Sequence, residues 1–390
     1  MKSRKIAIPL FYLVTTLYWF SLYTYVPTLS PYIKSVGASY KLVGIIIGSY
    51  GFTQMLLRIP LGILSDKLKI RKPFISAGVF LGMLSSLGMF LFHEPGWVLF
   101  FRSMAGVAAA TWVTYTVLFS SYFSEEDMPK SIGMINSYCF LGQVLAMLLG
   151  GAAAQYFTQF TPFLVGAVGG LAGLFVSFFI TEDKQVDRVP LKLRELLSVG
   201  KEKGLLIPSG LAIISQLLTF GTVFGFTPVA AKAIGATSFE LGLLTALSTL
   251  PGIFAAAMSG SIFAIKWGEK RTIIYGYILV ALSCLAIPYA KSLWVLYITQ
   301  MIGGFGQGTV FPLLMSASIK SVSEQKRATA MGFFQAIYGI GMFIGPIMVG
   351  FLSDSMSLFY GFWATGLIGL TGAVLTQLFM KTAPLKKLLH

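Results

Sequence analysis

Two arginines, Arg58 and Arg102, stand inside long apolar stretches of the 390-residue sequence. The 14 acidic residues all lie near the ends of such stretches or between them, so none is placed to neutralise a cation in the middle. A guanidinium in apolar surroundings binds carboxylates and phosphates through a planar fork of N–H donors. The two arginines therefore predict an anionic or zwitterionic ligand and make a cationic ligand a poor expectation.

Enzymatic chemistry inside apolar stretches would need a cluster of histidine, cysteine or acidic side chains. His93 lies between two stretches, and His390 ends the sequence. Cys139 and Cys284 stand in apolar stretches far apart, which is typical of small core residues rather than of a disulfide or a metal site. We expect no enzyme activity, no metal and no cofactor.

The composition requires a membrane. Hydrophobic residues make up 56% of the chain, charged residues only 11%, and the mean hydropathy is +0.79, whereas soluble domains carry about 25% charged residues. The near-continuous apolar runs at 75–92 and 165–180 also exclude the short alternating segments of a transmembrane barrel. A crossing helix needs roughly 20 apolar residues. On this basis the sequence predicts twelve transmembrane helices, at 6–27, 42–65, 73–92, 97–119, 131–152, 161–180, 205–226, 239–263, 271–289, 293–318, 328–352 and 357–380.

The basic residues predict how these helices are oriented. The first apolar run follows a basic N-terminus as in a signal peptide, but no small-x-small cleavage site follows it, so we interpret it as the first span. Of the 29 lysines and arginines, 23 fall on the side of the N-terminus, four on the opposite side and two within spans. The positive-inside rule then places both termini in the cytoplasm. The net charge of +15 therefore indicates topology and not a nucleic-acid partner.

The longest polar stretch divides the spans into six and six. The predicted organisation is an N-terminal bundle at 1–180, a cytoplasmic linker at 181–204 and a C-terminal bundle at 205–390. Leucines and cations at 191–201 could form a short helix on the membrane surface, and a solvated tether is the alternative.

An internal repeat relates the two halves. Gly37-Ala38-Ser39 matches Gly235-Ala236-Thr237, and Trp97-Val98-Leu99 with Gly106 matches Trp294-Val295-Leu296 with Gly303. Further glycine matches occur at nearly the same offset, about 200 residues. Parallel repeats of this kind place a substrate site near the membrane midplane and support alternating access by rocking of the two halves. The repeat itself indicates transport.

At the loop after the second span the chain resembles the major facilitator superfamily. Gly62 and Asp66 followed by a basic cluster that includes Arg71 are similar to the family's loop signature, although Lys69 and Ile70 depart from it. In this reading Asp66 faces the positive end of the eleventh helix and latches the inner gate. A basic turn that only fixes topology is the alternative. The second half keeps Gly260 but has Ala264 at the acidic position, so the latch should be one-sided.

The fourth span carries a second resemblance, because Arg102 and Gly106 match the Arg-x-x-x-Gly signature of proton-coupled antiporters in that superfamily. In the internal repeat, Thr299 occupies the position equivalent to Arg102. Arg102 could bind the substrate, take part in a proton relay or extend to the membrane surface. Arg58 could pair with backbone carbonyls or with Asp66.

Spans five and eleven carry a third signature. Glycines at antiporter spacing, with a Gly-Pro pair in span eleven only, favour export over import; ordinary helix packing is the alternative. The residues are Gly133, Gly142, Gly341, Gly345 and Pro346.

The family lines its cavity with spans 1, 4, 7 and 10, which here carry aromatic and amide residues whose alternative role is packing. These predicted substrate-binding residues are Tyr12, Thr16, Trp19, Tyr23, Arg102, Trp112, Tyr115, Gln216, Phe220, Gln300 and Gln307. The resemblance and the residues together predict a monomeric, multi-pass transporter in the cell membrane, which exports a small amphiphilic organic solute using the proton gradient. A uniporter or importer of an organic anion, and a transport-dead sensor, are the alternatives.

Overall fold

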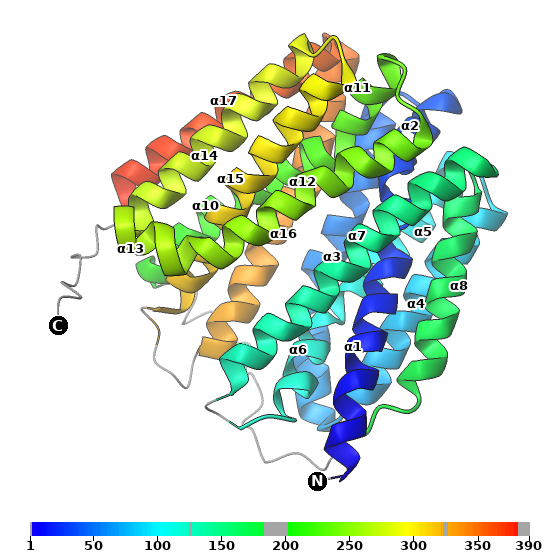
Figure 1. Ribbon diagram of the computed structural model, residues 1–390, viewed down its shortest axis with the longest axis vertical. Helices are drawn as coiled ribbons and strands as arrows, with labels where there is room; N and C mark the ends of the chain where they lie inside the picture. The colour runs from blue at the N-terminus through cyan, green and yellow to red at the C-terminus, as the bar shows by residue number, and fades with distance from the viewer. Residues whose placement is uncertain (1, 125–126, 183–201, 321, 323–326, 381–390) are drawn as a thin grey trace. The chain divides into compact units, whose positions relative to one another are not determined.

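The structure is a computed structural model that describes residues 2–124, 127–182, 202–320, 322 and 327–380. Within these ranges the regular elements are all helices (Figure 1). The first half contains α1 (Lys2–Tyr23), α2 (Val26–Ser35), α3 (Tyr40–Leu68), α4 (Lys72–Leu91), α5 (Pro95–Ala110), α6 (Trp112–Ser120), α7 (Met128–Tyr156) and α8 (Thr161–Ser177). The second half contains α10 (Lys203–Gly221), η1 (Thr222–Phe226), α11 (Thr227–Ala233), α12 (Ser238–Met258), η2 (Ser259–Phe263), α13 (Ala264–Trp267), α14 (Glu269–Ala286), η3 (Ile287–Tyr289), α15 (Leu293–Lys320), α16 (Arg327–Ser355) and α17 (Leu358–Phe379).

These elements form the predicted spans. In the described parts of the chain, ten segments are long and apolar enough to cross a membrane, and α8 is a shorter apolar helix. The remaining span is α15, a helix of 28 residues rich in glycine. The prediction of an all-α membrane protein is confirmed. Most span ends differ from the predicted ones by a few residues, but the first span continues to Ser35, eight residues beyond its predicted end, and the seventh continues to Ala233, seven residues beyond its predicted end. The structure adds breaks inside four spans, after α1, α5, α10 and α12.

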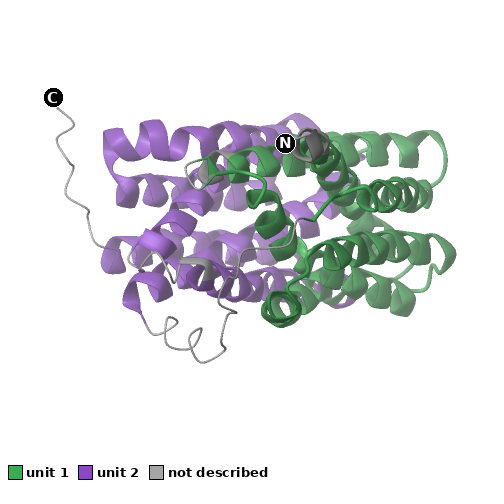
Figure 2. Ribbon diagram, turned by 90° about the horizontal axis from the view of Figure 1, so that it is seen from below, with its two compact units in different colours: residues 1–38, 45–193, 236–246 green, residues 39–44, 194–235, 247–390 purple. Residues whose placement is uncertain are grey.

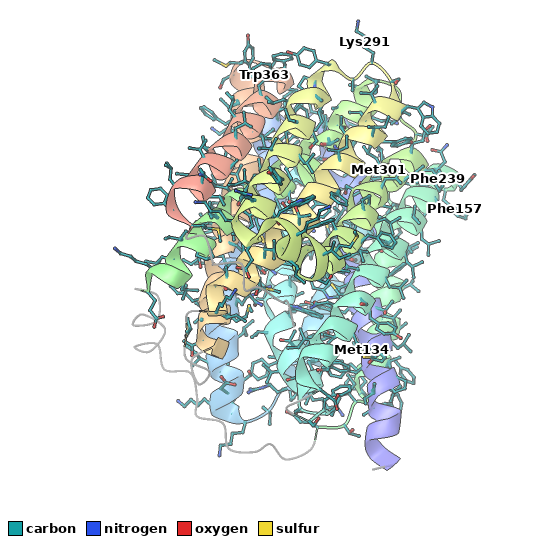
Figure 3. All side chains as sticks on the ribbon, turned by 60° about the vertical axis from the view of Figure 1, so that its left-hand side comes forward. Met134, Phe157, Phe239, Lys291, Met301 and Trp363 are labelled. Atoms are coloured by element: carbon teal, nitrogen blue, oxygen red, sulfur yellow. The ribbon has the colours of Figure 1, made fainter. Side chains whose placement is uncertain are left out.

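Apolar side chains cover the outer helix faces, as a lipid environment requires. Figure 3 shows Met301 projecting from α15 and Phe157 projecting from the end of α7, and these side chains are 43% and 76% exposed. Lys291 projects from the end of the bundle, in the loop between η3 and α15 (Figure 3). The exposed face of the described helices is therefore the apolar one that lipid tails would contact.

The chain forms two compact units, coloured separately in Figure 2. Unit 1 comprises 1–38, 45–193 and 236–246, and unit 2 comprises 39–44, 194–235 and 247–390. In unit 1, α1 packs on α7 and α8, and α4 packs on α5 and α8; in unit 2, α10 packs on α16, and α14 packs on α15 and α17. The first turn of α3 thus belongs to unit 2 and the first part of α12 to unit 1. The boundary predicted at 181–204 stays a prediction, because 183–201, including the amphipathic stretch, lie outside the described residues.

Candidate functional site

Arg102 is buried inside unit 1, with 2% of its surface exposed. Its guanidinium carbon lies 4.3 Å from the centroid of the Tyr50 ring and 5.6 Å from that of Tyr25. Nη1 donates a hydrogen bond to the Tyr25 hydroxyl at 3.1 Å, and Nε has no hydrogen-bond partner among the described residues. The ion pairs that join Arg71 to Asp66 and Lys320 to Glu269 do not involve Arg102. Arg102 is thus a buried cation held by aromatic rings, with no carboxylate beside it in the described residues.

The Arg-x-x-x-Gly spacing explains how Tyr50 reaches the guanidinium. A Cβ added at Gly106, one helical turn after Arg102, would overlap the Tyr50 carbonyl oxygen and the Thr53 hydroxyl. Thr53 Oγ1 also donates to the Ser103 carbonyl at 2.8 Å, which ties α3 to α5. Only glycine allows the two helices to approach this closely. The motif therefore places one wall of the Arg102 site.

The break between α1 and α2 places the other wall. Pro27 stands in the first turn of α2, where its ring and missing N–H prevent the helix from continuing through this point. Tyr25 lies at the break and is fully buried. Its hydroxyl is thereby available to accept from Arg102.

Arg58 of α3 contacts a second helix break, the one between α5 and α6. Its Nη2 donates to the Ala109 carbonyl at 3.4 Å, and the Tyr18 hydroxyl donates to the Ala108 carbonyl at 2.7 Å. These carbonyls end α5, where the helix dipole is negative. Of the two partners that the sequence suggested for Arg58, backbone carbonyls and Asp66, the structure shows a backbone carbonyl, that of Ala109.

Four predicted substrate residues of spans 1 and 4 gather in one aromatic cluster of unit 1. Trp19 contacts Tyr23 and Trp112, with ring centroids 5.6 Å and 5.2 Å apart, and Trp112 stacks on Tyr115 at 5.4 Å. All four side chains are buried, and the indole N–H of Trp19 has no hydrogen-bond partner in the described chain. An unpaired buried donor beside flat rings suits an amphiphilic ligand with an acceptor.

Tyr12 and Thr16 are placed elsewhere in unit 1, against α7. Tyr12 stacks on Tyr138, with centroids 4.1 Å apart and the ring planes 12° from parallel. Thr16 donates to the Tyr138 carbonyl at 3.4 Å. These two residues of α1 therefore contact α7.

The predicted residues of unit 2 are neutral. Gln307 Nε2 donates to the Ser215 hydroxyl at 2.7 Å, while its buried Oε1 has no partner among the described atoms. Gln300 is 3% exposed, Phe220 is buried and contacts Phe224, and Gln216 is half-buried. Unit 2 thus offers amide and aromatic groups but no ionised one at these positions.

Asp66 forms an ion pair with Arg71, and Arg71 Nη1 also donates to the Ser65 hydroxyl at 2.8 Å. Gly62 meets only ordinary contacts with Val113. The side chains at the start of α16, including Ala328, lie outside what is described, so the latch to the eleventh helix stays a prediction.

Glu182 is a residue that sequence reasoning missed: it accepts from the backbone N–H groups of Arg71 and Lys72, at 2.6 Å and 2.9 Å, and so caps α4.

The glycine signature lies along helix contacts. A Cβ would overlap backbone carbonyls of the facing helix at Gly142 and at Gly341, and it would lie 2.5 Å from the Leu217 oxygen at Gly345. The Pro346 carbonyl faces Gly44 of α3. Gly133 has no neighbour within 4 Å in the described chain.

Two helix caps at repeat-related positions were also missed. In unit 2, Asp354 of α16 accepts from the backbone N–H groups of Tyr40 and Lys41, both at 2.8 Å, at the start of α3. In unit 1, Gln155 of α7 accepts from the Ser238 N–H at 3.1 Å, at the start of α12. Terminal acids and amides of this kind give no signal in sequence, because their partners are distant in the chain.

Comparison with known proteins now identifies the fold. The sequence profile of the Major Facilitator Superfamily matches residues 11–227 and 209–389. The chain belongs to this superfamily. It is therefore a membrane transporter and not an enzyme, as the sequence predicted.

Relatives and a solved structure agree across nearly the whole chain. The class H tetracycline resistance protein of Pasteurella multocida is 24% identical, over 87% of this chain and 85% of that protein. A protein of Agrobacterium vitis provisionally named a tartrate transporter is 25% identical, over 90% and 87%. The crystal structure of a bacterial homolog of the human lysosomal transporter Spinster has a TM-score of 0.80 at 16% identity, covering 96% of each chain. As a superfamily member the chain takes small molecules as substrates and lies in the lipid bilayer, and its bacterial relatives indicate a cell membrane.

Proposed function

We propose that this superfamily member exports a small amphiphilic organic solute with an anionic or zwitterionic group, in exchange for protons. The observation that carries the proposal is Arg102, a buried cation that contacts tyrosines and no described carboxylate. A buried charge without a counter-ion is costly. A substrate carboxylate or phosphate would supply that counter-ion.

The neighbouring groups support the amphiphilic part of the proposal. The Trp19 cluster offers flat apolar surface in the same unit as Arg102. The relative named for tetracycline resistance favours export, and the relative provisionally named for tartrate favours an organic anion. The antiporter-like Arg-x-x-x-Gly spacing favours the proton gradient as the driving force.

A binding screen followed by a flux assay tests the proposal. Purified protein is heated with small aromatic carboxylates, amino acids and matched amines, and the shift in Tm is recorded. Carboxylates or zwitterions should stabilise the parent, and Arg102→Ala should lose this effect. The best ligand should then leave proteoliposomes uphill under a pH gradient, and a protonophore should stop it. Preferential stabilisation by amines would contradict the anionic class, and export insensitive to the pH gradient would contradict proton coupling.

We further propose a monomer with both termini in the cytoplasm. A cysteine at Glu94, in a loop predicted to lie outside, should react in intact cells with a membrane-impermeant thiol reagent. Labelling only after permeabilisation would reverse the orientation.

A further inference from the structure

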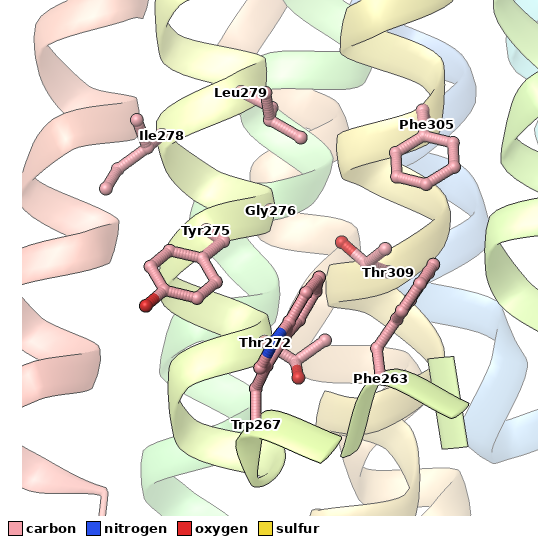
Figure 4. Close-up of a pocket in the computed structure, with 9 residues that line it drawn as sticks. All are labelled: Phe263, Trp267, Thr272, Tyr275, Gly276, Ile278, Leu279, Phe305 and Thr309. Carbon is pink, nitrogen blue, oxygen red and sulfur yellow. The ribbon is translucent and has the colours of Figure 1, made fainter. Parts of the chain in front are cut away.

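A cavity of about 330 Å³ lies within unit 2, between η2, α13, α14 and α15 (Figure 4). Aromatic rings form much of its wall. Phe263 and Trp267 stack with centroids 5.4 Å apart and planes 7° from parallel, and Phe305 lies 5.9 Å from Phe263. Trp267 and Tyr275 are 40% and 48% exposed, so the cavity opens at the outer face of the unit. Ligand pockets begin at about this size, roughly 300 Å³.

The walls of the cavity are almost entirely hydrocarbon: apart from two threonines, only the Trp267 indole and the Tyr275 phenol carry a hydrogen-bonding group. Its two threonines use their hydroxyl donors locally: Thr272 Oγ1 donates to the Gly268 carbonyl at 2.9 Å, and Thr309 Oγ1 donates to the Gly306 carbonyl at 2.7 Å. Its other lining side chains are aromatic or aliphatic. An apolar chain fits such walls, whereas a polar solute would lose hydration without compensation.

The mouth of the cavity is basic. Lys266 Nζ lies 5.9 Å from the centroid of the Trp267 ring, and Arg271 is an exposed residue next to Thr272. The loop contains a single acid, Glu269, and its carboxylate is engaged by Lys320 Nζ at 2.7 Å. The segment 266–271, which joins α13 to α14 beside the cavity, therefore carries three cations, Lys266, Lys270 and Arg271, and its single acid is engaged by Lys320.

We propose that this cavity binds an acyl chain of a phospholipid with a net negative headgroup, which lies against Lys266 and Arg271. Hydrocarbon walls beneath a cationic rim complement the two parts of such a lipid. Basic pockets between helices are known to take anionic headgroups, with about 1 kcal/mol per cation near an anionic surface. The adjacent Trp267 is of the type that anchors at the membrane interface.

Fluorescence quenching tests the site in the full-length protein. The protein is reconstituted in vesicles in which either phosphatidylglycerol or phosphatidylcholine carries bromine near the carboxyl end of one acyl chain, at equal mole fraction. Bromine quenches tryptophan only at short range. The signal of Trp267 is the difference between the parent and Trp267→Phe, and that of Trp294, a 74% exposed residue of α15, comes from Trp294→Phe. Trp294 serves as a lipid-facing control without the basic cavity.

Brominated phosphatidylglycerol should quench Trp267 at a mole fraction on the order of tenfold lower than brominated phosphatidylcholine does. Trp294 should show no such preference. Lys266→Gln with Arg271→Gln should abolish the preference at Trp267, whereas Lys232→Gln with Lys291→Gln, which removes the same charge elsewhere, should preserve it. Equal quenching by both lipids, a preference that survives Lys266→Gln with Arg271→Gln, or an unquenched Trp267 would each overturn the proposal.

Discussion

Units 1 and 2 share a helical frame but differ at the positions that carry charge. In unit 1, Gly106 brings the Tyr50 backbone against α5 one turn from Arg102; in unit 2, Gly304 brings the Ser248 backbone against α15 one turn from Gln300. The sequence match of Gly106 with Gly303 makes Thr299 the equivalent of Arg102. The matched helix contacts of Gly106 and Gly304 instead make Gln300 the equivalent of Arg102. Unit 1 thus holds a guanidinium where unit 2 holds an amide.

The surroundings of the two positions differ in the same way. Tyr25, which accepts from Arg102, precedes the Pro27 break, while Phe226 precedes the corresponding break at Pro228 and lacks a hydroxyl. Tyr50 likewise corresponds to Ser248. The repeat therefore supplies the same backbone contacts twice, and of the described residues at these matched positions only those of unit 1 carry an aromatic hydroxyl or ring face toward a buried cation. We infer that substrate charge is recognised by unit 1.

The largest expected effect is that of substituting Arg102. A substrate anion at a buried guanidinium would lose about 3 to 5 kcal/mol on Arg102→Ala, so binding should fall at least a hundredfold. Arg102→Gln, which copies unit 2, should do the same, and Arg102→Lys should recover only part, because the ammonium lacks the planar fork. Ligand-induced Tm shifts and flux in proteoliposomes are the measurements. Binding retained with gradient-driven flux lost would assign Arg102 to proton coupling, and parent-like behaviour would refute both roles.

The reciprocal substitution in unit 2 should mainly reduce stability. Gln300→Arg would bury a guanidinium in unit 2, where Ser248 and Phe226 correspond to Tyr50 and Tyr25 and offer no aromatic hydroxyl, and a cation inside a span costs about 2.5 to 3.5 kcal/mol. Folded yield and Tm should fall, whereas Gln300→Leu, of similar size, should be tolerated better. A stable Gln300→Arg protein would show that unit 2 can hold a buried cation, which would contradict the proposed difference between the two units.

Asp66 and its counterpart Ala264 come next. Asp66→Asn removes the ion pair with Arg71 and the carboxylate of the proposed latch, which is worth about 0.3 to 2 kcal/mol near a helix N-terminus. Transport should change more than Tm, and cysteine probes at the end of the helices that carries Asp66 should become more accessible. Ala264→Asp should not compensate. Unchanged accessibility in Asp66→Asn would reduce the motif to a topology signal.

The helix caps formed by Asp354 and Gln155 should differ in their contribution to the free energy of unfolding, by a smaller amount than the effects above. The start of α12 has its own acid, Glu240, which accepts from the Thr237 N–H at 2.8 Å, whereas the first turn of α3 contains no acid and receives the carboxylate of Asp354. Asp354→Ala should therefore cost about 1 to 2 kcal/mol and Gln155→Ala about half of that or less. Thermal unfolding of both variants gives the ranking. Equal losses would show that Glu240 does not substitute for Gln155.

Sequence periodicity and charge located the twelve spans because a bilayer imposes length and polarity on each helix. The breaks were not predictable in the same way: Pro27 marks one, but no proline marks the break at Thr111, where the Ala109 carbonyl is bound by Arg58. The buried position of Arg102 followed from its apolar surroundings, whereas its tyrosine partners depend on helix contacts between residues 52 and 77 positions apart. Residue type predicts which groups need partners, and only the packing selects them.

The smallest effect concerns the turns that follow α3 and α13. Among described non-glycine residues, Lys69 has a positive φ, at 54°, and the comparable turn in unit 2 uses Gly268 at 85°. The left-handed conformation costs a residue with a Cβ roughly 1 to 2 kcal/mol, which glycine avoids. Lys69→Gly should therefore raise stability by about 0.5 to 1 kcal/mol after the added entropy of the unfolded glycine is subtracted. Lys69→Ala, which removes the same charge but keeps the Cβ, is the matched control and should not stabilise. A gain in Tm common to both variants would assign the effect to charge in the basic turn, and a loss in Lys69→Gly would mean that the Lys69 side chain contributes more than the strain removes.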